Sequence, residues 1–261
     1  MTDYRFIQVD AFADRPFTGN PAAVMPLEAW LDDAVLQAIG EENNLAETAF
    51  TIPCTDGEAD YELRWFTPTL EIAMCGHATL ASGHVLLGDR DTIRFRTRKA
   101  GVLTVTRDGD GYALSLPARK PAPAELPDVA RLVGGAVLET LHHAGGYTVL
   151  VYADEAAIRA LTPDFAGLKA LGDTLFIATA PGKTADVVSR CFVPGAGIDE
   201  DPVTGAAHAV IVPYWAERLG RNRFTAYQAS SRGGHLACRL DDDRVVLGGR
   251  CVTVIEGVFR L

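Results

Sequence analysis

The sequence RWFTP at positions 64–68 is matched 126 positions further on by RCFVP at positions 190–194. A second pair of segments, ETAF at 47–50 and DTLF at 173–176, repeats at the same spacing. Two matches at one offset, with no insertion between them, indicate that the chain contains two copies of one structural unit. This repeat decides the fold that the sequence predicts.

The two copies also share an order of predicted elements. Apolar residues recur at helical spacing over 31–39 and over the counterpart segment 157–168. After each Phe-x-Pro strand end comes a helix that is led by glycine and ends near glycine, over 75–88 and over 204–220. The first of these helices is apolar almost all round, which is typical of a buried central helix.

A stretch rich in proline and alanine, 117–127, separates the copies and is the predicted linker. We therefore expect an N-terminal half over 1–118 and a C-terminal half over 119–261. The last predicted strand, about 252–259, has the pattern to pair with either half, the N-terminal one included.

The composition is typical of a soluble globular protein and excludes several classes of function. Of the 261 residues, 48% are hydrophobic and 22% are charged, and the net charge is −10. Because this charge repels a polyanion and no basic cluster offsets it, we expect no nucleic-acid partner. The sequence shows neither a membrane span nor a signal peptide, which predicts no membrane partner and a cytoplasmic protein.

The five cysteines are widely scattered, and neither they nor the histidines show the spacing of a zinc site. We therefore predict no bound metal. Cys75 differs from the other cysteines because it stands at the start of a central helix, where the helix dipole favours a thiolate. His77, in the first turn of the same helix, is expected to be neutral for the same reason.

The starts of the two central helices predict how an acidic protein binds an acidic substrate. The first N–H groups of a helix have no partner within the helix, and they attract anions. We expect both helix starts to face one cleft between the halves. There the N–H groups of Gly76, Ala78, Gly205 and Ala206 would hold a carboxylate or a developing enolate.

Several motifs, spread over nearly the whole chain, carry a family resemblance. They are QVDAF at 8–12, FTGNPAAV at 17–24, NLAETAF at 44–50, RWFTP at 64–68 with Glu71, CGHAT at 75–79, EDPVTG at 200–205, Gln228, Ser230 and RGG at 232–234. In this order they resemble the PhzF-like family, named for the phenazine-biosynthesis isomerase. That family is grouped with diaminopimelate epimerase and proline racemase.

The resemblance implies an α+β fold of two duplicated, pseudo-symmetric halves. Each half would be a curved, mainly antiparallel sheet around a central helix, with the active site in the cleft between the halves. The resemblance also implies a homodimer that works without a metal or organic cofactor. In the phenazine enzyme, a glutamate of the Ala-Glu-Thr-x-Phe motif moves a proton between two carbons of a cyclic amino acid.

Carried onto this chain, that glutamate matches Glu47, which becomes the expected general acid and base. His77 matches the family's histidine after glycine, and Asp201 matches its aspartate before proline. The remaining substrate contacts expected from the resemblance are Asn20, Thr204, Ser230 and Arg232.

Two departures from the phenazine enzyme leave the reaction open. Ala206 stands where that enzyme has a substrate-binding serine, which argues against the same substrate. Cys75 stands where diaminopimelate epimerase and proline racemase have a catalytic thiol, although this chain lacks the second thiol. The sequence therefore predicts a cofactor-independent isomerase of a small carboxylated substrate. The alternatives are an epimerase or racemase that uses Cys75, and a metabolite-binding relative without catalysis.

Overall fold

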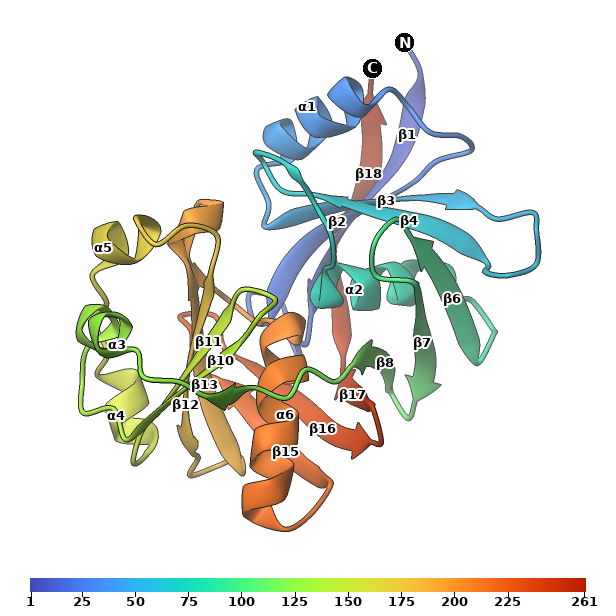
Figure 1. The fold of residues 1–261 in the computed structure, drawn as a ribbon. Coiled ribbons are helices and arrows are strands. Elements are labelled where there is room, and N and C mark those ends of the chain that lie inside the picture. The colour runs from blue at the N-terminus through green and yellow to red at the C-terminus, as the bar shows by residue number, and fades with distance from the viewer. The chain divides into compact units, whose positions relative to one another are not determined.

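In the computed structural model, which describes residues 1–261, the chain divides into two units (Figure 1). The first unit contains Met1–Ser115 together with Gly248–Leu261, and the second contains Leu116–Leu247. The last strand therefore belongs to the first unit. None of the helices combines the length and the hydrophobicity needed to cross a bilayer.

The first unit is built mainly of strands, with two helices. Its elements are β1 (Asp3–Ala11), β2 (Asn20–Pro26), α1 (Asp33–Asn43), β3 (Glu47–Pro53), β4 (Tyr61–Phe66), β5 (Glu71–Ile72), α2 (Gly76–Leu86), β6 (Thr92–Thr97), β7 (Val102–Asp108), the start of β8 (Gly111–Pro117) and β18 (Cys251–Arg260). The strands pair in the order β18, β1, β2, β3, β4, β6, β7, β8, and the short β5 also pairs with β4. Only the pairs β2–β3 and β4–β6 are parallel.

The second unit repeats this plan with more short helices. Its elements are β9 (Ala122–Pro123), α3 (Pro127–Val133), β10 (Glu139–His143), β11 (Tyr147–Val151), α4 (Glu155–Arg159), α5 (Phe165–Lys169), β12 (Leu175–Pro181), β13 (Val187–Val193), the 3₁₀ turn η1 (Pro194–Ala196), β14 (Ile198–Asp201), α6 (Gly205–Leu219), β15 (Arg223–Gln228), β16 (Gly234–Asp241) and most of β17 (Arg244–Gly249). Here the parallel pairs are β11–β12 and β13–β15. Each corresponds to a parallel pair of the first unit.

The repeated RWFTP and RCFVP segments form equivalent structures. Arg64 in β4 makes a two-pronged ion pair with Glu71, and Arg190 in β13 makes the same pair with Glu200. Each guanidinium also lies 5.0 Å from the ring of the phenylalanine two residues later. Equivalent strands and equivalent ion pairs confirm the predicted fold class of two duplicated α+β halves.

The central helix of the first unit is buried, as its sequence predicts. Every residue from Gly76 to Gly83 is buried, and α2 packs against β1, β2, β3, β6 and β7. Gly83 allows the closest approach, because a Cβ atom there would lie 2.5 Å from Cγ1 of Val105 in β7. A separate apolar cluster beneath α1 includes Met25, Leu36 and Phe50.

The helix predicted over 157–168 is wrong, because the structure has two short helices there, α4 and α5. Pro163 lies between them. Proline has no N–H to donate and disfavours helical geometry at the residue before it, so the helix ends ahead of it. Asp154 and Asp164 then cap the two pieces by accepting the N–H groups of Ala157 and Gly167.

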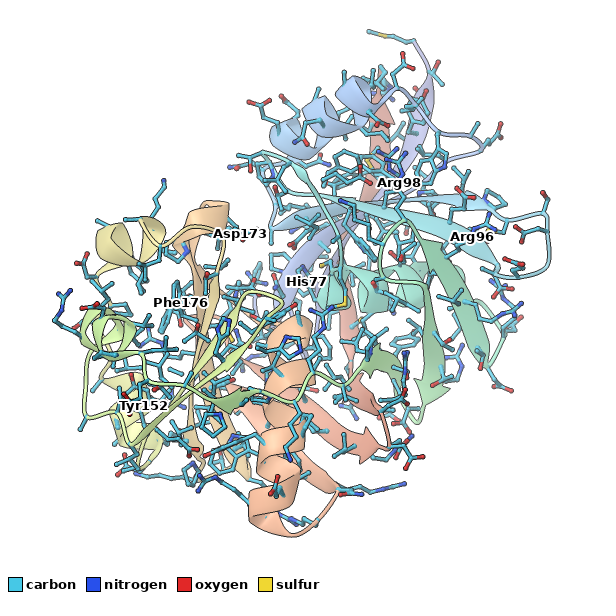
Figure 2. All side chains as sticks on the ribbon, in the orientation of Figure 1. His77, Arg96, Arg98, Tyr152, Asp173 and Phe176 are labelled. Atoms are coloured by element: carbon cyan, nitrogen blue, oxygen red, sulfur yellow. The ribbon has the colours of Figure 1, made fainter.

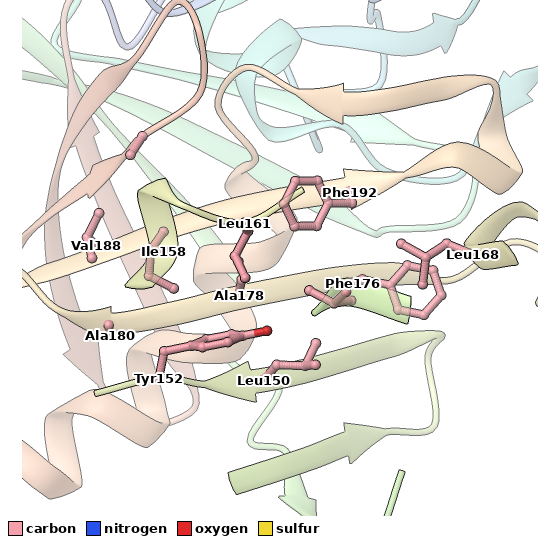
Figure 3. Packing of buried hydrophobic residues seen from close by; sticks show 12 residues of the cluster. Leu150, Tyr152, Ile158, Leu161, Leu168, Phe176, Ala178, Ala180, Val188 and Phe192 are labelled. Carbon is pink, nitrogen blue, oxygen red and sulfur yellow. The ribbon is translucent and has the colours of Figure 1, made fainter. Parts of the chain in front are cut away.

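Interrupting this helix does not expose its apolar side chains. Ile158 and Leu161 on one side of the break and Leu168 on the other all remain in the core of the second unit. Figure 3 shows them around Tyr152 and Phe176, over strands β11 and β12. The helical spacing therefore predicted correctly which side chains are buried, although it did not predict the break in the helix.

Candidate functional site

The elements of the first unit bring four of the predicted site residues together. Asn20 is the first residue of β2 and Glu47 is the first residue of β3. Because these strands are parallel, with Ala22 opposite Glu47, both side chains lie at the same end of the sheet. Cys75 and His77 belong to the start of α2, which packs against these two strands and where Figure 2 labels His77.

His77 is the centre of the group. Its Nε2 atom lies 2.8 Å from Oε2 of Glu47. On the other side of the ring, Nδ1 lies 3.1 Å from Nδ2 of Asn20 and 3.4 Å from Sγ of Cys75. All four residues are buried, with exposed fractions between 0% for Asn20 and 9% for Glu47.

The contact between His77 and Glu47 is close but poorly aligned. At 2.8 Å the two atoms are within hydrogen-bond distance, yet neither Nε2 nor Oε2 has a well-directed hydrogen bond. Catalytic hydrogen bonds are often poorly aligned until a substrate is bound. Both polar atoms are therefore available to a group that enters the site.

The buried charges change the acid–base behaviour of Cys75. Burial, reinforced by the charge of Glu47, raises the pKa of the Cys75 thiol to about 11. The expectation that the helix start favours a thiolate is therefore wrong. Removing the sulfur from water disfavours its charged form by more than the helix dipole offsets.

His77 is subject to opposing effects. Burial lowers its pKa, but the neighbouring Cys75 sulfur and Glu47 carboxylate more than compensate, so its pKa lies well above the usual range for histidine. The expectation that this histidine is neutral considered the helix dipole alone. The anionic neighbour, Glu47, comes from a distant strand, and sequence reasoning did not place it beside the ring.

Glu47 and its repeat counterpart Asp173 lie in different environments. Glu47 is buried at the start of β3, whereas Asp173 is exposed in the turn before β12; Figure 2 labels Asp173. An acid with a purely structural role would be expected in the same environment in both copies. The buried acid beside a histidine is specific to the first copy, which favours a chemical role for it.

The start of α2 offers backbone groups as well. Gly76 and Ala78 are buried in the first turn, and no side-chain hydrogen bond caps this helix. Thr79 and Ser82 instead donate to the carbonyl groups of Cys75 and Ala78. The first-turn N–H groups therefore remain the natural partners of an anion.

In the second unit, Asp201 and Thr204 are held in a buried hydrogen-bonded network. The Thr204 hydroxyl donates to Oδ2 of Asp201. Gln228, which is completely buried, accepts the Thr204 N–H at 2.8 Å and donates to the Asp201 carbonyl at 2.7 Å and to the Thr204 hydroxyl at 3.1 Å. Gln228 thus fixes the backbone at Thr204, the residue before α6.

Sequence reasoning did not include Gln228 among the site residues. The resemblance pointed to it, but a glutamine in a strand carries no local signal of catalysis or binding. The signal that could have identified it is its place at the end of β15, whose parallel partner β13 joins β14, the strand that carries Asp201.

The other predicted contacts of the second unit are placed as follows. Gly205 and Ala206 begin α6, whose first turn has no side-chain cap. The Ser230 hydroxyl donates to the Pro202 carbonyl at 2.8 Å and accepts the Gly233 N–H at 3.0 Å, so local bonds already engage it. Arg232 is half-buried and makes an interaction of its own.

The donor atoms of Glu47, Cys75 and His77 lie within 4.8 Å of one another. Carboxylate, thiolate and imidazole are groups that zinc accepts, but the ring nitrogen that binds the ion must aim its lone pair at it. Here both ring nitrogens already have close neighbours, Asn20 Nδ2 at Nδ1 and the Glu47 carboxylate at Nε2. The arrangement fits proton transfer better than metal binding, and a metal-free site stays a prediction.

Comparisons with known proteins agree with this description. The family model described as phenazine biosynthesis-like protein, PhzC-PhzF, matches residues 9–257. An uncharacterized isomerase of Pseudomonas aeruginosa is 49% identical over 259 residues, covering 97% of this chain and 98% of the relative. A human phenazine biosynthesis-like domain-containing protein is 38% identical over 280 residues, covering 96% of each chain.

Solved structures extend the likeness to the fold. A PhzF-family phenazine biosynthesis protein from Enterococcus faecalis matches with a TM-score of 0.92 and 43% identity, covering 100% of both chains. A hydroxyproline epimerase from Agrobacterium vitis matches with a TM-score of 0.61 and 11% identity, covering 98% of this chain and 92% of the epimerase. At that identity the second likeness is one of fold alone.

Proposed function

Because this chain belongs to the phenazine biosynthesis-like family PhzC-PhzF, we propose that it is an isomerase that moves a proton on a small carboxylated substrate. The proposal assigns the chemistry to side chains alone, without a metal or organic cofactor. The observation that carries it is the buried contact between Glu47 and His77 at the start of a helix whose N–H groups attract anions.

Glu47 is the proposed base. A carbon next to a carboxylate or within a conjugated ring releases its proton when the resulting negative charge is stabilised. Glu47 takes this proton and returns it to another carbon, or to the same carbon, of the bound substrate. The first-turn N–H groups of α2 hold the carboxylate or the enolate during the transfer.

Asp201 is the proposed second polar group, meeting the amine or a proton of the substrate. The Thr204 hydroxyl and the side-chain amide of Gln228 fix its position. The convergence of both helix starts on one substrate is part of this proposal and stays a prediction.

A second candidate reaction is epimerisation with Cys75 as a further acid and base. The observation that favours it is the position of Sγ, 3.4 Å from His77 Nδ1, in the same buried group as Glu47. Epimerisation needs an acid on the face opposite the base, and a thiol with a pKa of about 11 is protonated and able to donate. Loss of exchange in Cys75→Ala would favour epimerisation, whereas exchange that survives would favour migration of a double bond.

The test of the proposed function is hydrogen exchange in deuterated water. Amino acids and cyclic carboxylic acids are incubated with the protein, and NMR reports deuterium bound to carbon. For any compound that exchanges, Glu47→Gln should slow the exchange by about 10²–10⁴-fold. Asp173→Asn is the matched control, because it changes the repeat counterpart and should leave the rate unchanged. Equal rates in Glu47→Gln and the wild type would refute the role of Glu47.

A further inference from the structure

The turn before Asn20 fixes the position of this residue. The turn before it passes through Gly19 at φ +67°, where a Cβ atom would lie 2.2 Å from the Ala11 carbonyl oxygen. Phe17, also at positive φ, donates its N–H to the buried carboxylate of Asp10 at 2.8 Å. This conformation is costly for a phenylalanine, and such strain is retained where position matters. The turn delivers Asn20, completely buried, to the side of His77.

The contact between Asn20 and His77 is interpreted from the orientation of the Asn20 amide, whose Nδ2 atom faces the ring. The Nδ2 atom of an asparagine only donates hydrogen bonds, and it lies 3.1 Å from Nδ1 of His77. Nδ1 must therefore offer a lone pair. In a neutral imidazole the single proton is then on Nε2, which faces Glu47.

We propose that Asn20 is a positioning residue that places the proton of His77, in addition to any contact it makes with substrate. It holds the neutral ring with its proton on Nε2, the nitrogen that lies 2.8 Å from the Glu47 carboxylate. It also opposes full protonation of the ring, because a proton on Nδ1 would face the N–H of the Asn20 amide.

The neighbours of His77 have opposite effects on its protonation. The titratable groups that face His77 are Glu47 from β3 and Cys75 ahead of α2, and both favour the protonated ring. Asn20, from β2, is the neighbour that favours the neutral one. Because Asn20 opposes a proton on Nδ1, it disfavours transfer of the Cys75 proton to that nitrogen, and Cys75 stays a thiol.

The consequence for catalysis rests on the proposed function. An Nε2–H group beside Glu47 stabilises the carboxylate that has to accept a proton from carbon. Once Glu47 is protonated, the same N–H can turn to the substrate. The placement of the proton can nevertheless be tested without any substrate.

The experiment is NMR of the full-length protein with ¹⁵N-labelled histidine, with the His77 signals assigned from their loss in His77→Gln. We expect the neutral wild-type ring to carry its proton on Nε2. Asn20→Asp replaces the donor by an acceptor, so the ring should stay doubly protonated to a pH higher by about 1–3 units. Asn20→Leu should give a mixture of the two neutral forms.

Asn43→Asp is the matched control. Asn43 donates to the Thr48 hydroxyl next to Glu47 and not to His77, so it tests an added carboxylate nearby. It should raise the pKa of His77 by less than Asn20→Asp does. A neutral wild-type ring with its proton on Nδ1 would overturn the proposal, and so would unchanged titration in Asn20→Asp.

The wild-type spectrum tests the predicted position of the proton even if the variants do not fold, because a proton on Nδ1 would by itself overturn the proposal. It also separates the two proposals. A proton on Nε2 together with full exchange activity in Glu47→Gln would leave the role of Asn20 standing and remove the proposed role of Glu47.

Discussion

Nε2 of His77 lies 2.8 Å from Oε2 of Glu47, and both residues are at least nine-tenths buried. Neither residue would be stable there alone, because a buried charge or polar group without a partner costs several kcal/mol. The start of a helix and the start of a strand, 30 residues apart in the sequence, thus depend on each other.

This dependence predicts the outcome of a double-mutant cycle. His77→Ala leaves the Glu47 carboxylate buried without its partner and should lower the free energy of unfolding by about 3–5 kcal/mol. Adding Glu47→Gln should restore part of that loss, because no buried charge is left. Urea denaturation of the wild type, both single variants and the double variant measures the coupling. Additive losses would show that the two side chains do not stabilise each other.

The high pKa of the Cys75 thiol predicts slow, pH-dependent alkylation. With a pKa of about 11, the thiolate fraction at neutral pH is small and rises about tenfold with each pH unit. Labelling with iodoacetamide, followed by mass spectrometry of the peptide that contains Cys75, should show this slope up to about pH 10. A plateau near pH 8 would mean that the thiolate is stabilised, as the helix start alone would suggest.

We predict that His208 makes the folded protein less stable in acid. It is completely buried in α6, donates from Nδ1 to the Thr204 carbonyl at 2.8 Å, and has no partner at Nε2. Burial lowers its pKa to about 4. Near pH 6.5 the unfolded chain binds a proton at His208 and the folded chain does not. The contribution of the neutral, buried His208 to the free energy of unfolding is therefore complete above pH 6.5. It falls by about 3 kcal/mol as the pH drops to about 4.

The measurement is the free energy of unfolding at several pH values for the wild type and for His208→Gln. The raised pKa of His77 acts in the opposite direction, since a folded state that binds a proton more tightly is stabilised in acid. Only the difference between the two proteins isolates His208. That difference should shrink between pH 6.5 and pH 4, and a constant difference would contradict the assignment.

We predict that replacing Gln228, which carries no charge, strongly lowers the free energy of unfolding. Gln228→Ala removes its hydrogen bonds to Thr204 and Asp201 and leaves a buried N–H and carbonyl unpaired. Each unpaired group costs about 1–3 kcal/mol, so we expect a loss of about 2–5 kcal/mol. Gln37→Ala is the matched control, because that half-buried glutamine makes a single hydrogen bond, to the Thr67 carbonyl. Similar losses in both variants would mean that the network around Asp201 adds little.

Much of the fold could be predicted from the sequence because its signals are local and periodic. The repeat of RWFTP and RCFVP predicted two equivalent strands, and the structure adds equivalent ion pairs at Arg64 and Arg190. The segment after Cys75 is apolar on nearly all sides of the expected helix, which predicted a buried central helix. The structure confirms this, because α2 is buried. The helix over 157–168 was wrong because one proline outweighs the apolar spacing around it.

The sequence by itself determined the duplication, the buried glycine-led helix of the first unit and the identity of Glu47 and His77 as candidates, since each is written in residues close together or at a fixed spacing. Only the tertiary structure decided that Cys75 is a thiol of high pKa, that Asn20 meets His77, and that Glu47 is buried while Asp173 is not. The physical reason is that solvation and hydrogen bonding depend on which distant segments exclude water from a group, and no local pattern records that.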